Sequence, residues 1–200
     1  MTNFANAAAF DDPRSALQAM GTNLSENSAI VDAHGRVLAY ARTGGIIEKT
    51  RLELNPNETI YRFGSSAKST TEVARGGWWI QKREFEKLLQ FANSHGLFVG
   101  LAMRLLCLVP PEWSDAGLLV RARVVQSLLA WRGLANSVIT PIASGSGVFR
   151  MPHQNDISAR RIHQIFIPGL GDARFSEPPI SVENVYHLDP NQSAQGFLYL

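Results

Sequence analysis

The chain has 200 residues, of which 45% are hydrophobic and 18% are charged, and its net charge is +2. This composition excludes a disordered protein and allows one domain with a buried core. Lys and Arg are scattered without a dense basic run, so we expect no nucleic-acid partner. The single cysteine, Cys107, excludes an intrachain disulfide, and its apolar neighbours predict a buried thiol.

The N-terminal sequence carries no targeting pattern. Residues 1–10 lack a basic region followed by an apolar stretch, so we expect no secretory signal. The longest apolar stretch, residues 97–109, is too short to span a bilayer and contains Arg104. We therefore expect a cytoplasmic protein without a membrane partner, although delivery into another cell without a cleaved signal stays open. Residues 1–28 are expected to form a flexible N-terminal arm before a single globular domain at 29–200.

Strand patterns dominate the chain after residue 28. Residues 29–32 and 36–40 flank a turn that contains Gly35, which predicts a β-hairpin. Further strands are expected at residues 46–54, 59–63, 78–80, 137–142, 162–167, 183–188 and 196–200.

Two main helices are expected between these strands. Apolar residues recur with helical spacing in 82–94. Residues 116–131 show one broad apolar face and follow the capping residues Ser114 and Asp115. Residues 97–109 are so uniformly apolar that they predict a buried central strand. Together, these elements predict an α+β fold with a largely antiparallel β core.

Several short motifs do not indicate a function. Ser65-Ser66-Ala67-Lys68 matches SxxK, but the other elements of serine acyl-enzymes are absent from the sequence. Ser144-Gly145-Ser146-Gly147 lacks the lysine and the following helix of a phosphate-binding loop, so it predicts an ordinary loop. No two of the five histidines are spaced i, i+4, and we expect no metal site.

Three short motifs between residues 60 and 169 follow one another in an order that indicates a function. Residues 60–64 place an arginine in a short aromatic strand, residues 76–80 form an aromatic strand before a helix, and residues 163–169 form an apolar strand that ends at Pro168. This order resembles that of the ADP-ribosyltransferase superfamily. The resemblance implies an ADP-ribosyltransferase-like fold, NAD as the substrate and a protein acceptor, in an enzyme of the kind found among effectors and toxins.

The resemblance also implies roles for individual residues. It makes Arg62 and Gln164 the catalytic residues and places Tyr61, Arg62, Gly64, Trp78 and Trp79 around the bound NAD. The cation of Arg62 would bind the phosphates, and the aromatic residues would wall the nicotinamide pocket. Gln164 stands where the family has a catalytic Glu, whose charge stabilises the oxocarbenium-like transition state. A neutral amide supplies no such charge.

Three hypotheses therefore stay open. The chain is an enzyme that cleaves NAD or transfers ADP-ribose, with Glu177 or Glu183 supplying the missing charge. It is a degenerate relative that binds a nucleotide or a partner protein without turnover. Or it is an unrelated interaction protein, in which the apolar face of residues 116–131 pairs with a second copy.

Overall fold

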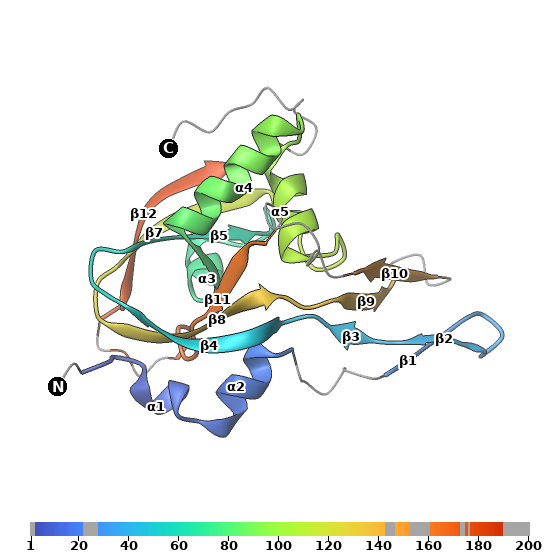
Figure 1. Cartoon of the computed structure of the whole chain (residues 1–200), viewed down its shortest axis with the longest axis horizontal. Coiled ribbons are helices and arrows are strands. Elements are labelled where there is room, and N and C mark those ends of the chain that lie inside the picture. Colours follow the sequence, from blue (N-terminus) through green and yellow to red (C-terminus); the bar gives the residue numbers. More distant parts are fainter. Residues whose placement is uncertain are drawn as a thin grey trace.

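The computed structural model describes residues 3–21, 28–142, 147–152, 161–172, 175 and 177–189 (Figure 1). Its helices are α1 (Ala7–Phe10), α2 (Pro13–Ala19), α3 (Thr70–Ala74), α4 (Lys82–Ser94) and α5 (Val99–Cys107). Its strands are β1 (Ala29–Val31), β2 (Val37–Tyr40), β3 (Arg42–Thr43), β4 (Ile46–Leu54), β5 (Thr59–Gly64), β6 (Trp78–Gln81), β7 (Leu118–Val124), β8 (Leu128–Ala135), β9 (Val138–Pro141), β10 (Val148–Met151), β11 (His163–Phe166) and β12 (Ile180–His187).

A seven-stranded sheet forms the centre of the fold. Its strand order is β12-β7-β5-β6-β11-β8-β4, and every neighbouring pair is antiparallel. A three-stranded sheet of β10, β9 and β3 and the hairpin β1-β2 extend from one side of it (Figure 1). The predicted α+β class with a largely antiparallel core is confirmed. The two main helices are α4 and α5, and only α4 is one of the two that the sequence predicted.

The short strand β6 joins the two halves of the large sheet. Trp78 and Trp79 pair with β11, whereas Ile80 and Gln81 pair with β5. Each neighbour therefore contacts only half of β6, and the two halves of the sheet separate there. This separation gives side chains on β5, β6 and β11 a common space to line.

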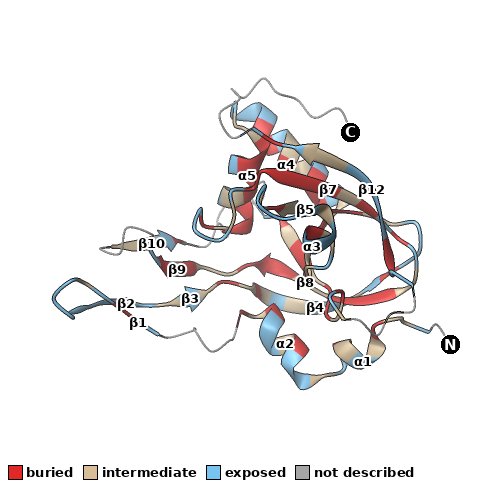
Figure 2. Cartoon of the chain, turned by 180° about the vertical axis from the view of Figure 1, so that it is seen from behind, coloured by how far each residue is buried: buried red, intermediate tan, exposed pale blue. Residues whose placement is uncertain are grey.

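Helices cover the sheet from two sides. Figure 1 shows α4 and α5 over the half that contains β5 and β7, while α1 and α2 lie against β4 and β8. Figure 2 shows buried residues along the sheet and exposed ones on the β1-β2 hairpin. The hairpin has the predicted turn, and Gly35 adopts a φ of 75°, which a side chain would strain.

The predicted strand at 97–109 is wrong, because this segment forms the helix α5. Residues Val99, Ala102, Met103 and Leu106 are buried with the spacing i, i+3, i+4, i+7. The exposed positions are apolar too, since 41% of Leu101 is exposed. Because apolar residues also lie on the solvent-exposed side of α5, the helical period is not visible in the sequence. The predicted helix 82–94, in contrast, is confirmed as α4.

The predicted helix at 116–131 is also wrong. The segment forms all of β7 and the first half of β8, and Leu118, Leu119 and Val120 are buried in succession. A strand buried on both faces shows no alternation, so its apolar run resembles one face of a helix. The apolar surface proposed for self-association is therefore part of the core.

Residues 3–21 are not the flexible arm that their composition predicted. Phe10 stacks on Trp131 with ring centroids 4.5 Å apart, and Trp131 Nε1 donates a hydrogen bond to Ser15 Oγ. Asn6 is buried and donates to the backbone oxygens of Leu129 and Pro168. The helices α1 and α2 are short and contain few large apolar residues, so the sequence did not indicate that this segment packs against the sheet. The strand predicted at 196–200 and most of the loop predicted at 144–147 lie outside the described residues.

We predict that Asn6→Ala lowers the free energy of unfolding by about 2–4 kcal/mol. The substitution leaves buried backbone groups at Leu129 and Pro168 without their partner, and each such group carries a desolvation penalty. Urea unfolding followed by circular dichroism measures the effect. Arg14→Ala, which removes an exposed ion pair with Asp12, should leave the midpoint unchanged. Equal effects of the two substitutions would contradict the proposed role of Asn6.

Candidate functional site

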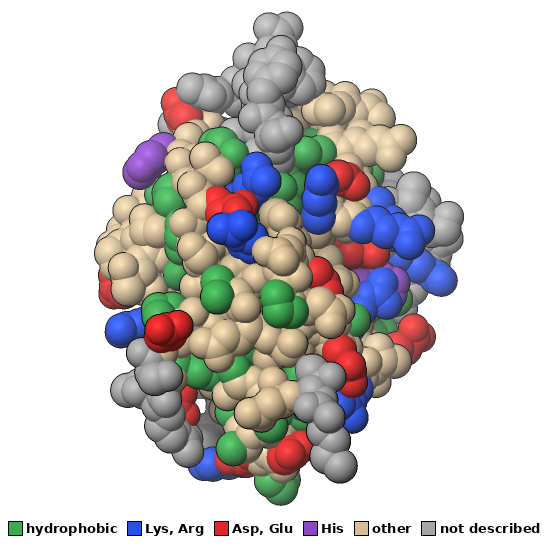
Figure 3. All heavy atoms as spheres, turned by 90° about the vertical axis from the view of Figure 1, so that its left-hand side faces the viewer, with side chains coloured by type: hydrophobic (Ala, Val, Ile, Leu, Met, Phe, Trp, Pro, Cys, Tyr) green, Lys and Arg blue, Asp and Glu red, His purple; other side chains and the backbone are tan. Residues whose placement is uncertain are grey.

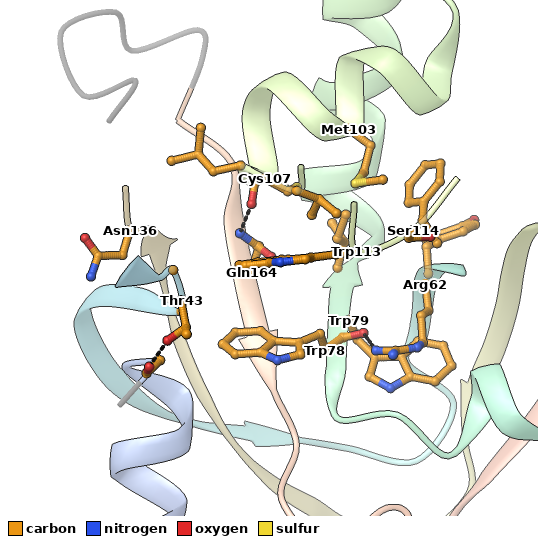
Figure 4. Close-up of a pocket in the computed structure, with 18 of the residues that line it drawn as sticks. Thr43, Arg62, Trp78, Trp79, Met103, Cys107, Trp113, Ser114, Asn136 and Gln164 are labelled. Atoms are coloured by element: carbon orange, nitrogen blue, oxygen red, sulfur yellow. Dashed lines mark hydrogen bonds between the residues drawn. The ribbon is translucent and has the colours of Figure 1, made fainter. Parts of the chain in front are cut away.

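A cleft of about 290 Å³ lies where the two halves of the large sheet separate (Figure 4). Residues of β5, β6 and β11 line it from the sheet, α5 and the segment 108–114 line it from above, and residues 43–45 line its rim. The volume is at the lower end of the range for small-molecule sites, about 300–1,000 Å³. The cleft can therefore enclose a nucleoside-sized part of a larger ligand.

Arg62, on β5, brings a positive charge to this cleft. No carboxylate pairs with it among the described residues, where its Nη1 donates to the Trp78 carbonyl and its buried Nε has no partner. Burial lowers the pKa of Arg62 to about 10, so the guanidinium stays charged at neutral pH. A Cβ on Gly76 would lie 2.0 Å from Arg62 Nη2, so glycine is needed there for the guanidinium to fit. A partly buried cation without a counterion favours an anionic ligand.

The two tryptophans of β6 have different surroundings. Trp79 is 1% exposed and donates from Nε1 to the Gly76 carbonyl, so most of its indole belongs to the core. Trp78 is half-buried and leans on Phe166, with ring centroids 4.9 Å apart. Both line the cleft, and Trp78, which is less buried than Trp79, presents the larger accessible aromatic surface to it.

Tyr61 and Gly64 fit the predicted site less well. Tyr61 lines the cleft, but its ring stacks on Phe85 with centroids 4.0 Å apart, and burial raises the pKa of its hydroxyl. Gly64 does not line the cleft, so the structure does not bring it together with the other residues predicted to surround NAD. A Cβ at Gly64 would lie 2.5 Å from the Val73 side chain, so the glycine lets α3 pack against β5.

Gln164, on β11, reaches the cleft from the other half of the sheet. Its Nε2 donates to the Cys107 carbonyl at 3.0 Å, and the residue is 9% exposed. Since a carbonyl can only accept, this bond fixes the amide orientation and leaves Oε1 as the free end. Oε1 has no hydrogen-bond partner among the described residues. It is therefore an oriented acceptor beside the cleft.

The carboxylates proposed to replace a catalytic Glu lie elsewhere. Glu183 bridges Arg121 and Arg123 on the neighbouring strand. Glu177 lies in a separate groove with residues of the 170–182 segment. No Asp or Glu of the described residues lines the cleft. Neither Glu177 nor Glu183 therefore lies where it could supply a negative charge to this cleft.

Sequence reasoning missed several lining residues. Trp113 is 46% exposed in the segment between α5 and β7, and the polar side chains of Gln18, Thr43 and Asn136 also line the cleft. A lone tryptophan after two prolines and between polar residues was a usable signal. It was overlooked because the residues that follow it were assigned to a helix.

Glycines let two distant segments meet at the rim of the cleft. A Cβ on Gly45 would lie 2.3 Å from the backbone N of Gly21, and Gly45 has a φ of 78°. Thr43 Oγ1 donates to the Gly21 carbonyl. The end of α2 thereby reaches the cleft and holds Gly44 and Gly45, the glycine pair, at its edge.

Glu84, at the start of α4, anchors the strand that carries Gln164. It is 3% exposed, accepts the backbone N–H of His163 at 3.0 Å, and contacts Lys87 and Arg132 at 3.0 and 3.3 Å. Burial alone raises the pKa of Glu84, but the His163 N–H bond and the Lys87 contact outweigh it and hold the pKa below its usual 4.5. Burial and Arg132 lower the pKa of His163, which favours the neutral ring.

We predict that Glu84→Gln destabilises the protein at pH 7 and that the difference from the native chain shrinks in acid. A carboxyl with a lowered folded-state pKa contributes stability above its unfolded pKa and loses it as pH falls through the folded value. Urea unfolding at pH 7, 5 and 3.5 measures this dependence. Glu86→Gln, at an exposed neighbouring position, is the control. A pH-independent difference would contradict the ionic role of Glu84.

Other chemistries find little support in the described residues. They contain no group of three or more His, Cys, Asp or Glu side chains that could hold a metal ion. Burial raises the pKa of Cys107 to about 12, which makes its thiol unreactive and confirms the predicted buried cysteine. No described helix has the length and apolar character required to cross a membrane. On the face shown in Figure 3, acidic side chains lie among the basic ones, including the basic side chains that gather at its right-hand edge.

Comparison with known proteins gives distant structural similarities. No family model and no curated protein matches the sequence. One similar solved structure is Rhs1-CT in complex with its cognate immunity protein RhsI1, with a TM-score of 0.42 and 12% identity over 77% of this chain and 89% of that one. Another is Tne2 in complex with Tni2, with a TM-score of 0.35 and 8% identity over 70% and 92% of the two chains. At such values, function has to be inferred from the residues of the cleft.

Proposed function

We propose that the cleft binds NAD and cleaves the bond between its nicotinamide and ribose, with water or a protein side chain as the acceptor. The observation that carries this proposal is the meeting of Arg62, Trp78 and Gln164, from three strands, in one cleft without a carboxylate among its described lining. A cation suits the diphosphate, an aromatic wall suits the nicotinamide, and an oriented acceptor suits a ribose hydroxyl.

The reaction breaks one bond heterolytically. The electron pair of the ribose–nicotinamide bond leaves with the ring nitrogen, which becomes neutral, and positive charge develops on the ribose. Gln164 Oε1 can accept a hydrogen bond from a ribose hydroxyl and so stabilise this charge through a dipole. Water or another nucleophile then attacks the ribose carbon and loses a proton. Acting inside a recipient cell, such an activity would make the chain an effector or toxin.

A second candidate function is binding without turnover. The observation that favours it is the neutral Gln164, because an amide dipole stabilises a developing cation less than a carboxylate does. In that case the cleft would hold NAD or a related nucleotide and the chain would act through a partner protein.

Proton NMR of NAD mixed with the native protein separates the two candidates. Release of free nicotinamide over hours supports the enzyme. Broadening of the nicotinamide signals without release supports the binding module. If neither occurs, the proposed function is wrong.

We predict that Arg62→Ala weakens NAD binding by about 10- to 100-fold, which is the loss expected for charge-assisted hydrogen bonds. Titration of the Kd measures it. Arg51→Ala removes another arginine, one that pairs with Glu53 on the surface, and should leave the Kd unchanged. Unchanged binding by Arg62→Ala would exclude Arg62 from the phosphate site.

If the native protein releases nicotinamide, we predict that Gln164→Ala and Gln164→Glu both lower kcat by at least about 10-fold. Alanine removes the acceptor, and glutamate places a carboxylate against the Cys107 carbonyl, where Gln164 donates a hydrogen bond. Steady-state nicotinamide release measures kcat, with Gln126→Ala on the surface as the control. A Gln164→Glu variant faster than the native chain would instead indicate that the native site lacks a needed charge.

A further inference from the structure

Trp113 lies on a segment that is held at its C-terminal end while its own side chain stays accessible. Arg104, on α5, donates to the Ser114 carbonyl, and Asp115 accepts the backbone N–H of Ser66 at 2.8 Å. These two bonds fix the residues that directly follow Trp113. Because 46% of Trp113 is exposed, its indole is positioned without being part of the core.

The indole of Trp113 reaches the glycine pair at the rim of the cleft. A Cβ on Gly44 would lie 3.5 Å from the Cη2 atom of Trp113 and 2.9 Å from the Val138 side chain. Gly44 has a φ of 83°, a conformation that residues with side chains rarely adopt. Glycine at this position therefore leaves the space into which the indole extends.

Trp78 stands opposite Trp113. Figure 4 shows the two indoles facing each other across the hollow, with Gln164 near Trp113 and the Arg62 guanidinium beside the Trp79 indole. The ring of Phe166, on the neighbouring strand β11, contacts the Trp78 indole and supports it. The cation of Arg62 is thus set apart from the space between Trp78 and Trp113.

We infer that Trp78 and Trp113 form a slot for a positively charged aromatic ring, so that the cleft selects oxidised NAD over its reduced form. This inference rests on the proposed function. The pyridinium ring of oxidised NAD is a cation, and the dihydropyridine ring of reduced NAD is neutral. Indole faces attract cations, and no carboxylate of the described lining supplies that attraction instead.

The slot also has a consequence for the order of events. While the ribose–nicotinamide bond is intact, the ring is charged and is held between the indoles. When the bond breaks, its electron pair neutralises the ring, and the cation–π attraction ends. The product nicotinamide is then bound more weakly than the charged ring of the substrate. This weaker binding favours the release of nicotinamide before it can react again with the ribose.

A matched pair of uncleavable rings tests the slot. The probes are 1-methylnicotinamide, a cation of the pyridinium type, and neutral nicotinamide, and ligand-observed NMR titration gives each Kd. The native chain is expected to bind the cation about 2- to 30-fold more tightly. Trp113→Ala should abolish this preference, and Trp113→Phe should retain part of it. Tyr40→Ala, which removes an exposed aromatic ring on the distant hairpin, should behave as the native chain does.

The outcomes distinguish this inference from the proposed function. Equal affinities for the two rings, no binding of either ring, or a preference that survives in Trp113→Ala would overturn the slot. Nicotinamide release from NAD by the native chain in the same preparation would leave the proposed function standing in each case. Absence of both NAD binding and ring binding would overturn the two together.

Discussion

The divided pairing of β6 is the constraint on which the cleft depends. A strand of four residues gives its first two to β11 and its last two to β5, so neither neighbour extends along its whole length. Antiparallel strands that meet only at such a junction diverge, and the side chains near it face a common hollow. Arg62 lies one residue after the part of β5 that pairs with β6, and Gln164 lies one residue before the part of β11 that pairs with β6. The strand register therefore explains why both residues line the same cleft.

The electrostatics of the cleft are unusual in one respect. It holds a charged arginine, and its described lining contains no acidic side chain. A positive charge held partly away from water needs compensation, and among the described residues the guanidinium of Arg62 donates a hydrogen bond only to the Trp78 carbonyl. An anionic group of a ligand would complete this compensation. The cationic ring of the same ligand would be attracted by electron-rich indoles and by the oriented carbonyl of Gln164, so opposite charges would occupy separate parts of one site.

The sequence allowed correct prediction of the elements in which the spacing of apolar residues distinguishes helix from strand. The helix α4 was predicted because its apolar residues recur with helical spacing between charged ones. Arg62, Trp78 and Gln164, which line one cleft, were selected because their strands follow one another in a recognisable order. The helix α5 and the strands β7 and β8 were missed because their apolar residues fall on all sides, which removes the pattern that separates helix from strand. That error also hid Trp113. The burial of Asn6 depends on backbone groups more than 120 positions away, which no local pattern can reveal.

The position of β11 has a consequence for how the protein is made. This strand comes late in the chain, at His163–Phe166, yet it lies in the middle of the large sheet between β6 and β8. Both neighbours leave the ribosome well before it and must wait with unpaired edges. Asn6 precedes Pro168 by 162 positions, so it waits longer still for the Pro168 carbonyl. The cleft therefore takes shape only after His163–Phe166 have been synthesised and have paired with both neighbours.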